Sequence, residues 1–213
     1  PIQKLRFTAL DSVSVQGRVK IIVEGKTDAE FLSHAYSVLT GGFMPYWTIT
    51  PSGRKHDTGS ANEVKETLLH SYPLLEKEDV IIGIVDHDNA GLSAYGYLKN
   101  DFDEQEPNTW KRHKDANIKI LCIPVPGEMS YYLKPRQEDN FFEIEHYFGH
   151  DFLVSKNVIR ETAIPNIYEV LDGRKTSFAR EMNDVQEPHI FENFLPLFQL
   201  IDKIAGVKVN YIL

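Results

Sequence analysis

The sequence predicts an α/β fold in which a mainly parallel sheet is flanked by helices. Three observations carry this prediction. Short apolar runs rich in β-branched residues recur between residues 19 and 125, and amphipathic segments of helical period lie between them. Two of the runs are apolar almost throughout, as in strands buried on both faces. Strands that alternate with helices are typical of a doubly wound parallel sheet.

The first half of this pattern is regular. The run VKIIVEG at 19–25 ends in a glycine turn and is predicted to be a strand. A helix is expected at 27–39, where apolar residues recur at helical spacing. A second strand is expected at 46–50, and a second helix at about 62–71. The loop at 51–60 between them is rich in glycine, serine and basic residues.

The second half contains two further buried strands, DVIIGIVDHD at 79–88 and IKILCIPV at 118–125. Residues 89–117 between them are expected to form a helix and an exposed acidic loop. From about Met129 the pattern becomes helical, either covering the sheet or forming a small lobe. The predicted organisation is therefore an N-terminal extension at 1–17, an α/β core at 18–127, and a helical C-terminal extension at 128–213.

Bulk composition restricts the function classes. Lys and Arg number 23 against 31 Asp and Glu, a net charge of −8, which excludes a simple basic nucleic-acid binder. Either the protein binds no nucleic acid, or local cations bridge the repulsion between its negative charge and the phosphates. The one cysteine, Cys122, excludes an internal disulfide and a cysteine zinc site. No apolar run approaches the roughly 18–20 residues that span a bilayer, and no signal-peptide pattern opens the chain. We therefore expect no membrane contact and a reducing cytoplasm.

Acidic residues follow two of the predicted strands. Glu24 ends the first, and Asp86 and Asp88 end the third. If the strand order begins 2-1-3, these ends are neighbours at the switch point where open α/β sheets bind ligands. Asp28 lies one helical turn beyond Glu24. Crowded carboxylates need a cation, and hard oxygen ligands select Mg²⁺ or Mn²⁺. Asp86 and Asp88 are two residues apart on an extended chain, so both are expected to reach one ion.

The same residues carry a family resemblance. VEGKTD at 23–28, followed by VDHDNAG at 85–91, resembles the TOPRIM signature, and the glycine loop at 52–62 fits between them. The resemblance covers about 19–125, half of the chain. It implies a Rossmann-like TOPRIM fold with a Mg²⁺ site for phosphoryl transfer on nucleic acid.

The C-terminal segments EIEHYF, RKTSFAREM and FENFLPLFQLIDKI are similar to the end of TOPRIM nucleases of the overcoming-lysogenization-defect (OLD) type, including anti-phage defence nucleases. That resemblance implies one more acidic residue, matched here by Glu145 or Glu143. It also implies a lysine, matched by Lys175, which would neutralise charge on the phosphate. The chain departs from the OLD pattern in having no Walker A motif. The ATPase is therefore a separate partner, a missing domain, or never existed here.

The resemblance implies a two-metal nuclease that cleaves DNA or RNA by in-line displacement at phosphorus. Glu24, Asp86 and Asp88 would hold one ion that activates a water, while Asp28 and Glu145 would help to hold a second near the leaving oxygen. Glu24 would also serve as a general base or acid. Mn²⁺ is expected to substitute for Mg²⁺.

Plainer interpretations stay open for several residues. Asp28 also stands where it would cap its helix. Lys175 and the basic run at 111–114 also fit ordinary solvated cations. His87 is expected to point away from the ligands on either side of it. The stripe FENFLPLFQL at 191–200 is either core or a docking surface for a partner.

Two functional alternatives also stay open. One is a TOPRIM module that binds nucleic acid or assembles without turnover, and the other is a fragment of a topoisomerase or primase. The oligomeric state also stays open, with a homo-oligomer as one alternative. Nothing marks any of the 10 tyrosines as a nucleophile, and no zinc domain of a primase is visible.

Overall fold

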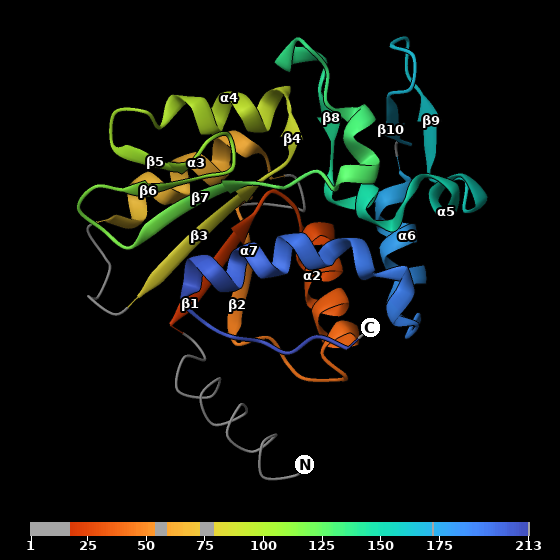
Figure 1. Ribbon diagram of the computed structural model, residues 1–213, viewed down its shortest axis with the longest axis horizontal. Helices are drawn as coiled ribbons and strands as arrows, with labels where there is room; N and C mark the ends of the chain where they lie inside the picture. Colours follow the sequence, from red (N-terminus) through yellow and green to blue (C-terminus); the bar gives the residue numbers. More distant parts are fainter. Residues whose placement is uncertain (1–17, 54–58, 73–78, 172, 213) are drawn as a thin grey trace.

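The computed structural model describes residues 18–53, 59–72, 79–171 and 173–212 (Figure 1). The expected N-terminal extension at 1–17 and part of the glycine loop, 54–58, lie outside the described residues. The fold is built on a six-stranded sheet with helices on both faces. Its order is β2 (Trp47–Pro51), β1 (Val19–Val23), β3 (Val80–Val85), β7 (Ile118–Cys122), β6 (Trp110–His113), β5 (Phe102–Glu106).

The first four strands in this order run parallel, and the last two are antiparallel to their neighbours. The expected order 2-1-3 is therefore confirmed. The chain is an α/β protein with a mostly parallel central sheet, an arrangement compatible with a Rossmann-like fold.

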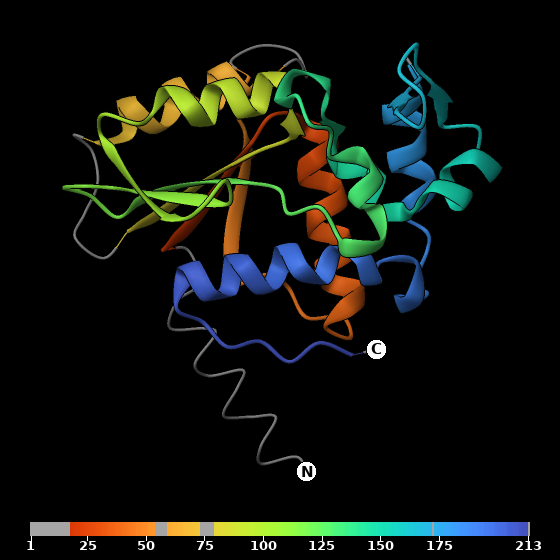
Figure 2. The ribbon, with the colours of Figure 1, turned by 45° about the horizontal axis from the view of Figure 1, so that its top comes forward.

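Side-chain alternation along the strands builds two cores. Ile21 of β1 packs with the long helix α2 (Lys26–Leu39) on one face, whereas Ile22 packs with α3 (Ala61–Ser71) and α4 (Asn89–Tyr97) on the other. Figure 2 shows α3 and α4 on one side of the sheet and α2 on the other. Because both faces are covered, the central strands contain few polar residues.

One expectation for 89–117 is wrong. The helix is present as α4, but the acidic stretch after it forms β5 and pairs with β6 in an antiparallel hairpin instead of a loop. β5 is an edge strand with most of its side chains exposed. Its sequence is therefore polar and lacks the apolar pattern by which a strand is predicted. Lys111, in the basic run expected to be solvated, is buried in β6, and its Nζ donates to the Tyr95 carbonyl at 2.8 Å.

The C-terminal helix α7 (Leu195–Ala205) covers the α2 face of the sheet (Figures 1 and 2). Phe194, Leu197, Phe198 and Ile201 are fully buried there. The core interpretation of FENFLPLFQL is thus confirmed, and the alternative of a docking surface is wrong, because these side chains face the protein interior.

The segment from residue 128 onward contains more than helices. A hairpin and a two-residue strand interrupt it, and much of its helix is of the short 3₁₀ kind. Its elements are η2 (Gly127–Tyr132), η3 (Gln137–Asp139), β8 (Phe141–Phe142), η4 (Ile144–Phe148), α5 (His150–Ser155), β9 (Ile159–Glu161), β10 (Tyr168–Val170), α6 (Arg174–Met182), η5 (Pro188–Ile190) and η6 (Glu192–Phe194).

Cys122 is buried, and burial raises the pKa of its thiol well above the ordinary value, so it is an inert core residue. In the part of the chain that the structure describes, every helix is too short or too polar to cross a membrane.

Candidate functional site

The carboxyl ends of the paired strands β1 and β3 bring Glu24 and Asp86 into contact. The backbone N–H of Asp86 donates to Oε1 of Glu24 at 3.1 Å. Burial raises the pKa of Asp86 well above its usual range, and the nearby charges of Glu24, Asp28 and Glu143 raise it further. Burial also raises the pKa of Glu24. The crowding of carboxylates expected from the sequence is therefore present at this edge of the sheet.

Two glycines allow the backbone to approach these strand ends closely. A Cβ atom on Gly91 would overlap the carbonyl of Asp86, and one on Gly59 would overlap the carbonyl of Glu24. Ser52 Oγ donates to the same Glu24 carbonyl at 3.2 Å. Glycine is therefore required at both positions, and the glycine loop noticed in the sequence packs directly on the end of β1.

Asp28 caps its helix and also lies beside the other carboxylates of the cluster. It lies in the first turn of α2, and its Oδ2 accepts a hydrogen bond from the Gly25 N–H at 2.7 Å, so it caps the helix. Its carboxyl group also borders the cluster. Burial raises the pKa of Asp28 to about 7, the charge of Glu145 acts in the same direction, and the charge of Lys175 opposes both.

Contrary to the expectation from the sequence, Asp88 does not continue the strand that ends before Asp86. β3 ends at Val85, and Asp88 belongs to a two-residue strand, β4 (His87–Asp88), that pairs with β8 rather than continuing the main sheet. Its Oδ1 accepts the Gly91 N–H at 2.7 Å and caps α4, because the chain turns into a helix there. Asp88 nevertheless lies near enough to raise the pKa of Glu24. His87 points away, with Nδ1 3.2 Å from the Ile123 carbonyl, as predicted.

Glu143, Glu145 and Lys175 complete the cluster. Nζ of Lys175 lies 3.2 Å from Oε2 of Glu143 and 3.4 Å from Oε1 of Glu145. Glu145 is fully buried, and among the described residues its two carboxylate oxygens have no hydrogen-bond partner. Burial raises the pKa of Glu143 to about 7. Burial lowers the pKa of Lys175, but the charges of Glu145 and Glu143 outweigh it, so the pKa is raised and the ammonium keeps its proton.

The sequence left open which of the two glutamates belongs to the site, and the structure brings both there. Every predicted site residue meets in one cluster, namely Glu24, Asp28, Asp86, Asp88, Glu143, Glu145 and Lys175. Four helices begin beside the cluster. Each has at its N-terminus a residue that belongs to the cluster or contacts it, namely Asp28 of α2, Ala61 of α3, Asp88 before α4 and Lys175 of α6. Their macrodipoles favour the negative charge gathered here.

His146 is a residue of the site that the sequence did not reveal. It follows Glu145 directly in the sequence and is buried. Its Nδ1 accepts the Glu143 backbone N–H at 2.9 Å, and its Nε2 lies 2.8 Å from the Tyr168 carbonyl, to which it donates. Burial lowers the pKa of His146 to about 4, so the ring is neutral. Its role comes from contacts across 22 residues, which the sequence spacing does not display.

The donor chemistry of the cluster suits a hard divalent cation, since the facing groups are carboxylates. As the side chains lie, no group of three or more His, Cys, Asp or Glu within the described residues is arranged to hold a metal ion. Lys175 is the cation that compensates Glu143 and Glu145. A metal would therefore require this ammonium to move and the carboxylates to draw together.

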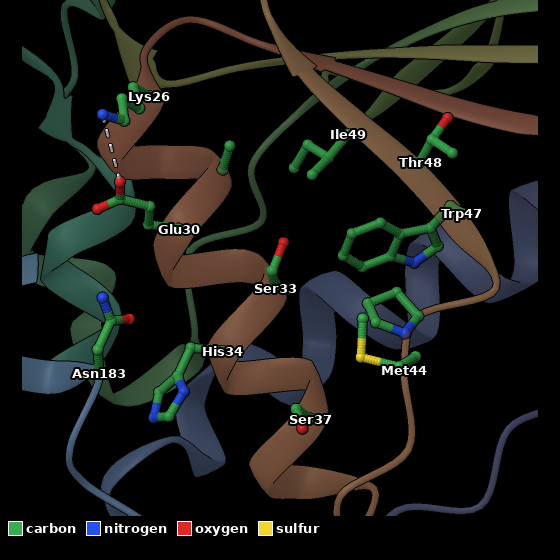
Figure 3. Close-up of a pocket in the computed structure, with 12 residues that line it drawn as sticks. Lys26, Glu30, Ser33, His34, Ser37, Met44, Trp47, Thr48, Ile49 and Asn183 are labelled. Carbon is green, nitrogen blue, oxygen red and sulfur yellow. Dashed lines mark ion pairs between the residues drawn. The ribbon is translucent and has the colours of Figure 1, made fainter.

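A shallow groove lies elsewhere, between α2 and the edge strand β2 (Figure 3). Trp47, Ile49 and Ser33 line it, and a Lys26–Glu30 ion pair of 3.9 Å closes one end. The clustered carboxylates lie outside this groove, so it is separate from the site.

No protein-family model, no curated protein and no solved structure matches this chain significantly. The resemblance to TOPRIM proteins therefore rests on the two motifs in the sequence.

Proposed function

We propose that this protein is a Mg²⁺-dependent TOPRIM nuclease of the OLD-like type, which hydrolyses phosphodiester bonds in DNA or RNA. The observation that carries the proposal is the convergence of acidic side chains from strand ends, helix starts and the segment after the sheet onto one lysine. The cluster lies at the carboxyl ends of β1 and β3, where open α/β sheets bind their ligands.

A purely structural role explains this cluster poorly. Buried carboxylates are expensive unless each is paired, and here one ammonium faces several of them. Strongly perturbed pKa values in a group of neighbouring residues are typical of functional sites. The two oxygens of Glu145 have no hydrogen-bond partner among the described residues, and the ion pair of Oε1 with Lys175 is 3.4 Å long, so this buried carboxylate could bind a further cation.

The proposed roles follow from position. Glu24, Asp86 and Asp88 would hold one ion, and Asp28 and Glu145 a second, with Glu143 as a further ligand. The bound ions would supply Lewis acidity and lower the pKa of an attacking water. The Gly25 and Gly91 N–H groups hold Asp28 and Asp88 in fixed orientations.

During cleavage, the ammonium of Lys175 would move from Glu143 and Glu145 to the phosphate of the substrate. Once Glu143 and Glu145 are compensated otherwise, its ammonium is available to the non-bridging oxygens of the phosphate. Charge on those oxygens grows in the transition state, so a positioned cation there accelerates cleavage.

A TOPRIM module that binds without turnover is the second candidate. The observation that favours it is the direct ion pairing of Lys175 with both glutamates, which compensates part of the cluster by the chain's own cation. We also propose that the protein is cytoplasmic and acts together with a separate ATPase. Such a partner would link the protein to anti-phage defence. Co-purification from the native host that recovers no ATPase would count against that partner.

Nuclease activity is tested by incubating the protein with plasmid, single-stranded DNA and RNA in Mg²⁺, Mn²⁺ or EDTA. We expect cleavage in both metals and none in EDTA. The matched variants are Asp86→Asn, which should be inactive, and Asp103→Asn on the exposed face of β5, which should cleave like the wild type. Full cleavage in EDTA would end the metal hypothesis, and binding without cleavage in any metal would favour the second candidate.

A further inference from the structure

Phe141 lies directly opposite a residue of the carboxylate cluster. β4 and β8 pair antiparallel with Asp88 opposite Phe141 and His87 opposite Phe142. Opposed side chains share one face of such a pair, and successive residues alternate between faces. Phe142 is fully buried, so the Asp88–Phe141 face is the outward one, and both of these residues are partly exposed.

The phenyl ring of Phe141 rests on a rigid support. Its centroid lies 6.2 Å from that of His146, with the rings at 90°. His146 is fixed by its two hydrogen bonds and by stacking on Phe142 at 5.5 Å. A ring held this way loses little conformational freedom when a flat ligand packs against its free side.

The net charge of the protein favours a contact that does not depend on charge. With a net charge of −8, long-range attraction to phosphate cannot supply the affinity that basic nucleic-acid-binding proteins obtain from it. Metal ions would bridge only the phosphate at the cluster. Stacking of bases on aromatic side chains is the other general source of affinity, and it does not depend on charge.

We propose that Phe141 is a stacking surface for an unpaired nucleobase next to the phosphate held at the cluster. The inference rests on the proposed function and names its substrate class, which is single-stranded or locally unpaired nucleic acid. Opposed side chains in an antiparallel pair have Cβ atoms roughly 5 Å apart, so the ring lies within one nucleotide of Asp88. A base inside an intact duplex has both faces covered by its neighbours and cannot stack there.

The test compares two single strands that carry the same phosphates. A labelled dT 12-mer and an abasic 12-mer are bound by fluorescence anisotropy in Ca²⁺, a hard cation used to allow binding without turnover. We expect the wild type to bind the dT 12-mer more tightly, by on the order of 10-fold, because stacking is lost with the bases. A 12-base-pair duplex should bind more weakly than the dT 12-mer.

Phe141→Leu keeps an apolar side chain against His146 but has no ring face, so it should bind both 12-mers as weakly as the wild type binds the abasic one. Phe141→Trp should keep the preference for dT. The control is Tyr97→Leu, an exposed aromatic residue at the end of α4, which should behave like the wild type.

Equal affinity of the wild type for both 12-mers would overturn the inference, as would a Phe141→Leu variant that keeps the preference. Weaker binding of the abasic strand by this variant would also contradict it, because Phe141 would then act through the cluster. A wild type that binds the dT 12-mer preferentially yet cleaves nothing in Mg²⁺ or Mn²⁺ would support the stacking surface and contradict the proposed nuclease instead.

Discussion

Nζ of Lys175 lies 3.4 Å from Oε1 of Glu145, whose side chain is fully buried. The two residues are 30 positions apart in sequence and come from α6 and η4. This ion pair joins two parts of the segment after the sheet, and the same ammonium also lies near enough to Glu24 and Asp86 to act on their charges.

Replacing Lys175 should therefore separate stability, metal affinity and catalysis. Lys175→Met removes the cation that faces Glu143 and Glu145, so we expect the metal-free protein to lose about 1–3 kcal/mol of stability. This is less than a fully buried pair would lose, because the lysine side chain is 38% exposed. Affinity for Mn²⁺, measured by calorimetry, should rise because the competing ammonium is gone. Cleavage should fall by on the order of 10²–10³.

The control for this variant is Lys203→Met, which breaks an exposed ion pair with Glu106 of 2.9 Å. It should change stability by less than about 1 kcal/mol and leave Mn²⁺ binding unaltered. A Lys175→Met protein with wild-type stability and wild-type cleavage would show that the lysine is ordinary surface.

Asp86→Asn should remove activity without harming the fold. The carboxyl of Asp86 is buried beside Glu24, Asp28 and Glu143, and a neutral amide of the same shape relieves their repulsion. We expect the melting temperature of metal-free protein to stay the same or rise. The backbone N–H that bonds to Glu24 is retained. Unfolding of this variant at room temperature would favour a structural role for the aspartate.

His146 should act by positioning the glutamates. The shorter side chain of His146→Asn can still accept the hydrogen bond from the Glu143 N–H. The longer side chain of His146→Gln can still donate to the Tyr168 carbonyl, but it loses the hydrogen bond from Glu143. We expect both variants to be less stable, but Mn²⁺ affinity to fall by roughly 10- to 100-fold in His146→Gln and much less in His146→Asn.

The exposed His70→Asn should match the wild type in this experiment. Equal Mn²⁺ affinities for the two His146 variants would show that the bond to Glu143 does not position the site.

Asp202 should give the protein a pH dependence that is independent of the site. It accepts hydrogen bonds from Tyr46 at 2.9 Å and Tyr211 at 2.7 Å, and burial raises its pKa to about 6. The folded state thus holds a proton more tightly than the unfolded chain, whose aspartate pKa is about 3.9. The stability contribution is complete below that value and is lost as pH rises through about 6.

Between pH 4.5 and 7 this loss should amount to about 2 kcal/mol in the wild type, relative to Asp202→Asn. Urea unfolding at the two pH values measures the double difference, which cancels the titration of all other groups. The exposed Asp103→Asn should show no such difference from the wild type. A pH dependence in Asp202→Asn as steep as that of the wild type would contradict the assignment.

Local pattern was enough to predict the parallel part of the sheet and the positions of Glu24 and Asp86. Buried strands leave apolar runs in a sequence, and the residue that follows each run lies at a strand end. The order 2-1-3 then places the two carboxylates side by side. Asp28 could be assigned to the start of its helix for the same local reason.

Tertiary packing decided the rest. The acidic stretch of β5 becomes a strand only because β6 pairs with it, and the aromatic stripe of α7 is buried only because the α2 face of the sheet receives it. The meeting of Lys175 with both glutamates, and of Phe141 with Asp88, depends on contacts between distant segments. Spacing along a chain reports which side chains share a strand or a helix face, whereas contact between separate elements is determined by how the whole core packs.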